Sequence, residues 1–309
     1  MMKATVYKST GSWYVTKTEE GQFINSRIKG VFKIDGITST NPVAVGDSVE
    51  LEPENDADET AMITGILPRK NYITRQSPGH KMQHHIVAAN VDQSLMFATL
   101  REPRTSQGFI DRFLVTCEAY HVPAIIVFNK TDLYRNKERE KEKELTEVYT
   151  RIGYKVFTIS VEREENLDEV TSQLKNKVTL MSGHSGVGKS SFLNKVFPSF
   201  RLKTSEVSGW SGKGMHTTTF AEMFRLDATS FVIDTPGVKE LGLVDMTPQE
   251  ISDYFPEMRD RRLECKYGSR CLHVTEPSCA IIQDLNSGEI ARSRYDNYLS
   301  MISGSDNRK

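Results

Sequence analysis

Short runs of alternating apolar and polar residues, separated by turn-forming glycines, fill the first part of the chain. Examples are "ATVYKS", "SWYVTK", "GDSVELE" and "TAMITGIL". An apolar side chain at every second position is typical of a strand with one buried face. Several short strands joined through glycine turns therefore predict a small β-barrel or β-sandwich over residues 1–72.

The pattern then changes to short apolar runs that alternate with longer amphipathic segments. The predicted strands are "QSLMFATL", "PAIIVF", "KVFTIS", "KVTLMSG" and "SFVIDTPG", and helical patterns lie between them. This alternation predicts a mainly parallel sheet with helices on both faces, over residues 73–240. Residues 241–309 show short helical patterns and a cysteine cluster, which predict a small, mostly helical third domain. The expected fold class is multidomain α/β.

Composition agrees with a soluble protein. Of the 309 residues, 38% are hydrophobic and 26% are charged. The apolar runs are too short to span a bilayer, and "MMKATVYKST" lacks the apolar stretch of a secretory signal. We therefore expect a cytoplasmic protein with no membrane partner, and we expect a monomer.

The stretch "SGHSGVGKSS" at 182–191 fits G-x-x-x-x-G-K-[ST] and lies between a predicted strand and a predicted helix. Glycines allow backbone N–H groups to surround phosphates, and the helix N-terminus adds a positive end. Lys189 is expected to reach the β- and γ-phosphates, and the Ser190 hydroxyl to hold Mg²⁺. The context makes a chance match improbable.

Two other strand ends carry matching chemistry. "FVIDTPG" places Asp234 for the Mg²⁺ shell and Gly237 near the γ-phosphate. "NKTD" at 129–132 supplies Asp132, whose carboxylate can accept the two N–H groups of guanine but would face an acceptor on adenine. These features predict a GTPase.

The remaining nucleotide contacts follow from the same loops. Ser160, in "TIS", is expected to offer a backbone contact to the base, and Thr218 is our choice among Thr217–Thr219 for the Mg²⁺ shell. The predicted nucleotide contacts are Asn129, Lys130, Thr131, Asp132, Ser160, Gly183, His184, Ser185, Gly186, Val187, Gly188, Lys189, Ser190 and Ser191. The predicted Mg²⁺ ligands are Ser190, Thr218 and Asp234.

Catalysis is expected to depend on Lys189, Gly237 and His216. The residue after Gly237 is Val238, where Ras-like enzymes carry a glutamine that orients water. Valine cannot do this, so intrinsic turnover should be slow. His216 is the candidate for orienting the water; the alternative is that it packs or contacts RNA.

Cys265, Cys271, His273 and Cys279 read C-x₅-C-x-H-x₅-C. Three thiolates and an imidazole complete a tetrahedral shell with no open position, which predicts one structural Zn²⁺ site.

A strip from Thr60 to Val91 contains no Asp or Glu but several cations. Its candidate RNA contacts are Arg69, Lys70, Arg75 and Lys81. The alternative is a solvated linker that happens to be basic.

The order "NKTD", "TIS", "GHSGVGKSS", "HTTT", "DTPG" is rotated relative to an ordinary small GTPase. It resembles the circularly permuted GTPases of the RsgA/YjeQ family, as do "VGDSVEL", "ILPRKNYITR" and "KGMHTTT". The resemblance covers nearly the whole chain. It implies an N-terminal OB-fold, a permuted GTPase domain and a C-terminal zinc domain. It also implies GTP hydrolysis stimulated by the small (30S) ribosomal subunit, contact with 16S rRNA, and action late in subunit maturation.

Two alternatives remain open from the residues. One is a binding module in which GTP licenses docking and hydrolysis matters little. The other is a P-loop kinase of a small metabolite, which "NKTD" and "DTPG" disfavour.

Overall fold

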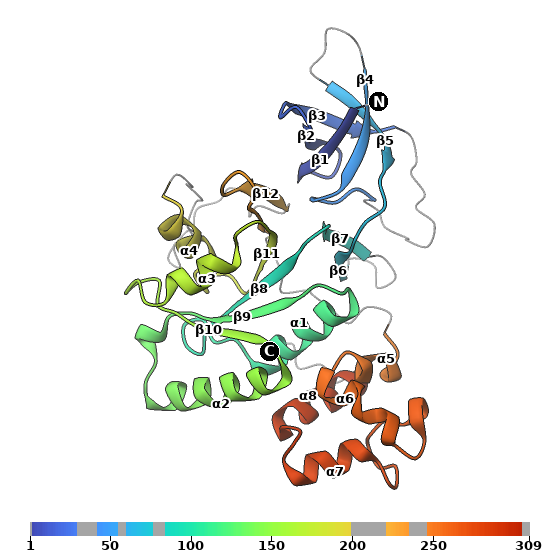
Figure 1. The fold of residues 1–309 in the computed structure, drawn as a ribbon, viewed down its shortest axis with the longest axis vertical. Helices are drawn as coiled ribbons and strands as arrows, with labels where there is room; N and C mark the ends of the chain where they lie inside the picture. The colour runs from blue at the N-terminus through green and yellow to red at the C-terminus, as the bar shows by residue number, and fades with distance from the viewer. Residues whose placement is uncertain are drawn as a thin grey trace, which may run out of the picture.

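The computed structural model describes residues 2–29, 42–54, 60–76, 84–198, 221–234 and 246–304. Along its long axis, a small barrel (blue) is followed by an α/β layer structure (green to yellow) and a helical unit (orange to red), as Figure 1 shows. No helix in the described part of the chain has both the length and the apolar character needed to cross a bilayer.

The described N-terminal residues form a closed barrel of five strands, which confirms the first of the two predicted alternatives, a small β-barrel. Its strands are β1 (Met2–Ser9), β2 (Tyr14–Thr18), β3 (Phe23–Ile28), β4 (Ser48–Pro53) and β5 (Thr60–Ile66). They pair in the order β1-β2-β3-β5-β4, and β4 returns to β1. Only β3 and β5 run parallel. This is the Greek-key barrel of an OB-fold.

A two-stranded antiparallel ribbon follows the barrel. It consists of β6 (Tyr72–Gln76) and β7 (His84–Ala89). The loop before β4 approaches β7 closely, because a Cβ added at Gly46 would lie 2.1 Å from the carbonyl oxygen of Ala89. Gly46 has a φ of +92°, so the position demands glycine for both reasons.

The central sheet has the predicted mainly parallel character. Its strands are β8 (Gln93–Ala98), β9 (Ala124–Phe128), β10 (Lys155–Thr158), β11 (Val178–Ser182), β12 (Glu222–Arg225) and β13 (Phe231–Asp234). They lie in the order β10-β9-β8-β11-β13-β12. All are parallel except β12, an antiparallel strand that the sequence analysis did not anticipate. It also pairs with β1 of the barrel through Lys8 and Glu222.

Helices cover both faces of this sheet (Figure 1). They are α1 (Gln107–Ala119) and α2 (Asn136–Ile152) on one face, and α3 (Leu167–Gln173) and α4 (Lys189–Val196) on the other. The period of two in β8 explains the division, because Met96 and Ala98 pack in the core with α1 whereas Leu95 and Phe97 pack with α3 and α4.

The C-terminal unit is helical and small. It contains α5 (Pro248–Asp253), α6 (Pro256–Arg259), α7 (Ala280–Ser287) and α8 (Arg292–Ile302). Three short 3₁₀ helices complete the described elements: η1 (Thr131–Leu133), η3 (Arg261–Glu264) and η4 (Gly268–Arg270). The core of this unit includes the three clustered cysteines, and Val115 of α1 packs into it. Helix α1 therefore contributes side chains both to the core under the central sheet and to the core of the C-terminal unit.

Candidate functional site

The predicted nucleotide loops meet at one edge of the central sheet. Asn129 follows β9, Ser160 lies just beyond β10, the segment 183–188 follows β11, and Asp234 ends β13. These strands are parallel neighbours or next neighbours, so their carboxyl ends open on the same side. Residues far apart in the rotated sequence order are thus brought together by the topology.

The loop 183–188 wraps tightly between β11 and α4. Gly183 has a φ of +131°, and a Cβ there would lie 2.3 Å from the carbonyl oxygen of Phe97. Gly188 has a φ of +97°, and a Cβ there would lie 2.3 Å from the Nδ2 atom of Asn129. Neither position can carry a side chain without moving its neighbour. The glycines that the sequence pattern required are therefore required by contacts as well.

Lys189 folds back over this loop. Its Nζ donates to the carbonyl oxygens of Gly183, at 2.8 Å, and His184, at 3.1 Å. Burial lowers the pKa of Lys189 below its ordinary value, and the Asp234 carboxylate opposes this. The ammonium is thus a partly desolvated cation held over a loop of backbone amides, a setting suited to phosphate.

The 129–132 segment is fixed to two other loops. The Asn129 side chain accepts a hydrogen bond from the backbone N–H of Val161, at 3.3 Å, and donates to the carbonyl of Val187. The Ser160 hydroxyl donates to the Asp132 carboxylate at 2.6 Å. We expected a backbone contact from Ser160, and the structure adds this side-chain role in orienting Asp132. Lys130 adopts a left-handed φ of 63° and donates to the carbonyl of Glu102.

Sequence reasoning missed Tyr134. Its buried hydroxyl accepts a hydrogen bond from the Leu100 backbone N–H, at 3.1 Å, and donates to the carbonyl of Asn129, at 3.0 Å. Tyr134 thereby ties the loop after β8 to the 129–132 segment. No periodic pattern marks this residue; an aromatic two residues after "NKTD" is the only signal.

Comparison with known proteins agrees with this geometry. The family model described as RsgA GTPase matches residues 66–244, and the RsgA N-terminal domain model matches residues 3–63. The chain belongs to the RsgA GTPase family. It is therefore a GTPase, and this family membership excludes the alternative that the chain is a P-loop kinase of a small metabolite.

Individual relatives resemble the whole chain. The small ribosomal subunit biogenesis GTPase RsgA of Christiangramia forsetii is 49% identical over 306 residues, covering 99% of this chain and 97% of the relative. RsgA 2 of Bacteroides thetaiotaomicron is 47% identical over 308 residues, covering 100% and 98%.

Solved structures of the family are also similar. YjeQ from Thermotoga maritima superposes with a TM-score of 0.77 at 32% identity, covering 100% of this chain and 99% of that one. YloQ, described as a circularly permuted GTPase, superposes with a TM-score of 0.71 at 27% identity, covering 100% and 96%. The rotated order of motifs is thus a family property.

The structure of this RsgA-family chain gathers the predicted metal ligands into one buried cluster. The ligand atoms of Cys265, Cys271, His273 and Cys279 all lie within 4.8 Å of one another. The Sγ atoms of Cys265 and Cys279 are 3.8 Å apart, and Nδ1 of His273 lies 3.6 and 3.4 Å from them. With Zn–S of about 2.3 Å and Zn–N of about 2.0 Å, a tetrahedral shell has edges of about 3.8 and 3.5 Å. The residues fit zinc.

The surroundings hold this cluster in shape. The Glu276 carboxylate accepts hydrogen bonds from the backbone N–H groups of Leu272, Val274 and Thr275. The Tyr295 hydroxyl donates to the carbonyl of His273 at 2.6 Å. Burial raises the pKa of the Cys279 thiol to about 12. Zinc would have to displace this proton on binding, because it is ligated by the thiolate.

The cations of the basic strip between Thr60 and Val91 have different surroundings in the structure. The Arg69 side chain is 9% exposed, and its guanidinium donates to both oxygens of Asp47 at 2.7 Å and to the carbonyl of Pro42. This arginine joins the barrel to the segment after it and is not presented to a phosphate, contrary to our expectation. Lys70 is exposed and pairs with Asp92.

Several predicted residues lie outside the described parts of the chain. They are Lys81, His216, Thr218 and Gly237, together with the side chain of Arg75.

Proposed function

We propose that the site at the sheet edge binds guanine nucleotides with Mg²⁺ and hydrolyses GTP to GDP and phosphate. In this proposal the 183–191 loop and Lys189 hold the phosphates, and Asp132, oriented by Ser160, reads guanine. Ser190, Thr218 and Asp234 would hold Mg²⁺, which neutralises phosphate charge when bound. The convergence of Asn129, Ser160 and the phosphate loop in one hydrogen-bonded unit is the observation that carries the proposal.

We further propose that the protein's partner is the small ribosomal subunit and that the protein acts late in the maturation of this subunit, in the cytoplasm. The support is that relatives matching over nearly their full length are named small ribosomal subunit biogenesis GTPases. Lys70, Arg75 and Lys81 are proposed contacts to 16S rRNA. An OB-fold next to a GTPase domain fits this role, because OB-folds commonly bind nucleic acid.

We propose that the chain has three domains with separate roles. Residues 1–72 form the OB-fold, 73–240 the permuted GTPase domain, and 241–309 the zinc-binding domain. The Cys265, Cys271, His273 and Cys279 cluster holds one structural zinc ion, since four protein ligands leave no position for a reacting water.

One assay tests the proposal. GTP and ATP hydrolysis are measured with purified small subunits, with large subunits and without ribosomes, using a Lys189→Ala variant as the inactive control. Strong stimulation of GTP hydrolysis by small subunits alone is the expected result. Equal rates in all three conditions would rule out the proposed partner, and equal use of ATP would rule out the proposed base reading.

His216 is proposed to orient the attacking water in place of a glutamine. A His216→Ala variant should bind GTP normally but lose subunit-stimulated turnover, by roughly 10²-fold or more. Full stimulated turnover in that variant would assign His216 to packing or RNA contact instead.

A further inference from the structure

The first turn of α1 lies between the phosphate loop and the C-terminal unit. On one side, the ring of Phe109 stacks on the imidazole of His184, with centroids 3.9 Å apart and planes inclined by 30°. His184 belongs to the phosphate loop, and its carbonyl oxygen accepts a hydrogen bond from Lys189. A displacement of Phe109 would therefore change the packing of His184, whose carbonyl oxygen is a hydrogen-bond partner of Lys189.

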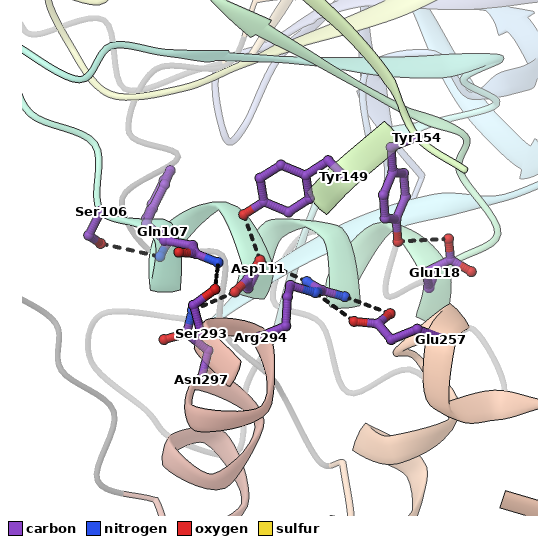
Figure 2. A network of polar contacts seen from close by, with 11 residues as sticks. Ser106, Gln107, Asp111, Glu118, Tyr149, Tyr154, Glu257, Ser293, Arg294 and Asn297 are labelled. Carbon is purple, nitrogen blue, oxygen red and sulfur yellow. Dashed lines mark hydrogen bonds and ion pairs between the residues drawn. The ribbon is translucent and has the colours of Figure 1, made fainter. Parts of the chain in front are cut away.

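On another side, the same turn contacts α8. The Gln107 side chain donates to the Ser293 hydroxyl at 2.9 Å. Gly108 lets α8 approach, because a Cβ there would lie 3.3 Å from Oδ1 of Asn297. The Asn297 amide in turn donates to the carboxylate of Asp111 (Figure 2).

A buried ion network fixes this contact. Figure 2 shows Arg294 of α8 between Asp111 of α1 and Glu257 of α6. The guanidinium donates to Asp111 at 2.7 Å and to both oxygens of Glu257, and the Tyr149 hydroxyl also donates to Asp111. The side chains of Arg294 and Asp111 are 0% exposed. Separating such groups would leave an uncompensated buried charge, so α1 and α8 should move as one body.

We propose that Phe109 is a positioning residue for the phosphate loop, and that docking of α8 on α1 sets its position. The C-terminal unit thereby influences nucleotide affinity through Asn297, Phe109 and His184, without touching the nucleotide. A partner bound to the C-terminal unit can therefore change the affinity of the phosphate site for nucleotide through this contact. By reciprocity, a bound nucleotide changes the affinity of the C-terminal unit for that partner by the same factor. The inference rests on the proposed nucleotide site.

The first test compares two ring deletions, one in the first turn of α1 and one at the residue that caps its C-terminal end. Phe109→Leu removes the stack on His184. Tyr120→Leu removes the ring that packs on Tyr72, 5.1 Å between centroids, and the hydrogen bond between its hydroxyl and Thr74. Two quantities are measured for each variant of the full chain: its affinity for a fluorescent GDP analogue and its melting temperature. We expect Phe109→Leu to weaken GDP binding by roughly two- to tenfold, and Tyr120→Leu to leave it unchanged. Equal effects from the two variants would overturn the proposal.

The second test asks whether α8 acts through Phe109. Asn297→Ala should weaken GDP binding, and its neighbour Asp296→Ala, which breaks only the exposed pair with Arg292, should not. The double variant of Phe109→Leu and Asn297→Ala should lose less affinity than the product of the single losses, as expected for coupled residues. Independent losses, or no loss from Asn297→Ala, would refute the coupling.

A spectroscopic readout separates positioning from stability. In protein labelled with ¹³C at histidine, the His184 ring signal should shift in both Phe109→Leu and Asn297→Ala, because the Phe109 ring current acts on it. An unmoved signal in Asn297→Ala would contradict the proposal. Wild-type protein that fails to bind GDP would instead refute the proposed function, so the two failures are distinguishable.

Discussion

The side-chain amide of Asn129 donates a hydrogen bond to the carbonyl oxygen of Val187, 2.8 Å away, across 58 residues of sequence. The proposed guanine-reading segment, 129–132, and the proposed phosphate loop, 183–188, are therefore joined by a direct hydrogen bond. Gly188, next to Val187, leaves the room for it, since a Cβ there would meet the same amide. The Asn129 side chain thus helps to fix the proposed base-reading and phosphate-binding segments relative to each other.

Gly188→Ala should uncouple these two parts. The new methyl group would displace Asn129, and we expect GDP affinity to fall by roughly 10²-fold because the phosphate loop shifts. Gly153→Ala is the matched control, since Gly153 has a φ of +109° but nothing within 4 Å of an added Cβ. Both variants should lose about 1 kcal/mol of stability from the left-handed backbone. Comparable GDP affinity in the two variants, measured by calorimetry, would contradict this reading.

Asp132→Asn should change the choice of base. The amide would present a donor where the guanine edge also presents donors, so GTP affinity should fall by at least roughly 10²-fold. A base with a carbonyl oxygen in place of guanine's amino group, as in xanthosine triphosphate, should then bind better than GTP. Ser160→Ala, which removes the hydrogen bond to Asp132 and the one accepted from the Arg163 backbone N–H, should weaken GTP binding without reversing the preference. Unchanged preference in Asp132→Asn would sink the assignment.

The sequence predicted those parts of the molecule that local patterns encode. Strand–helix alternation identified the parallel sheet, and its topology then explains why Asn129, Ser160 and Asp234 meet. The cysteine spacing identified a cluster whose distances suit zinc. Strand β12 was not anticipated, because a strand of four residues carries little periodic signal.

Long-range pairing is what the sequence could not provide. Arg69 was grouped with RNA-facing cations because its charge is visible in the sequence, whereas its partner Asp47 lies 22 residues earlier. Likewise, Arg294 is part of an ordinary polar helix in the sequence, although it pairs with Asp111 across 183 residues. Such contacts depend on how domains dock, and local composition does not record that.

Removal of zinc should destabilise the C-terminal unit. Cys265, Cys271 and Cys279 are part of its core, so loss of the ion leaves three buried thiols and an imidazole without their partner. Cys279→Ser should reduce the zinc content from one per chain to near zero and should lower the melting temperature of this unit. Cys117→Ala, a buried thiol on α1 outside the cluster, should leave the zinc content unchanged. Full zinc content in Cys279→Ser would exclude that ligand.

Asp92 should make stability depend on acid pH. Partial burial raises its pKa, but hydrogen bonds from Lys70 and the Val178 backbone N–H, with the charges of Lys70 and Lys177, outweigh this and leave the pKa lowered. A carboxyl group whose pKa is lower in the folded state stabilises that state above its unfolded pKa, near 3.8, and loses this effect as pH falls through the folded value. Because the side chain is 36% exposed, the contribution should be below about 1 kcal/mol.

Asp92→Asn tests this pH dependence directly. The variant should be slightly less stable than the wild type in urea at pH 7 and at pH 5, and the difference should shrink as pH falls below 4. Asp296→Asn serves as the control, because its pair with Arg292 is exposed within one helix. The amide oxygen of the replacement side chain can still accept the hydrogen bond from the Val178 backbone N–H. A difference for Asp92→Asn that stays constant down to pH 3 would therefore show that the lost stability comes from packing rather than from the charge.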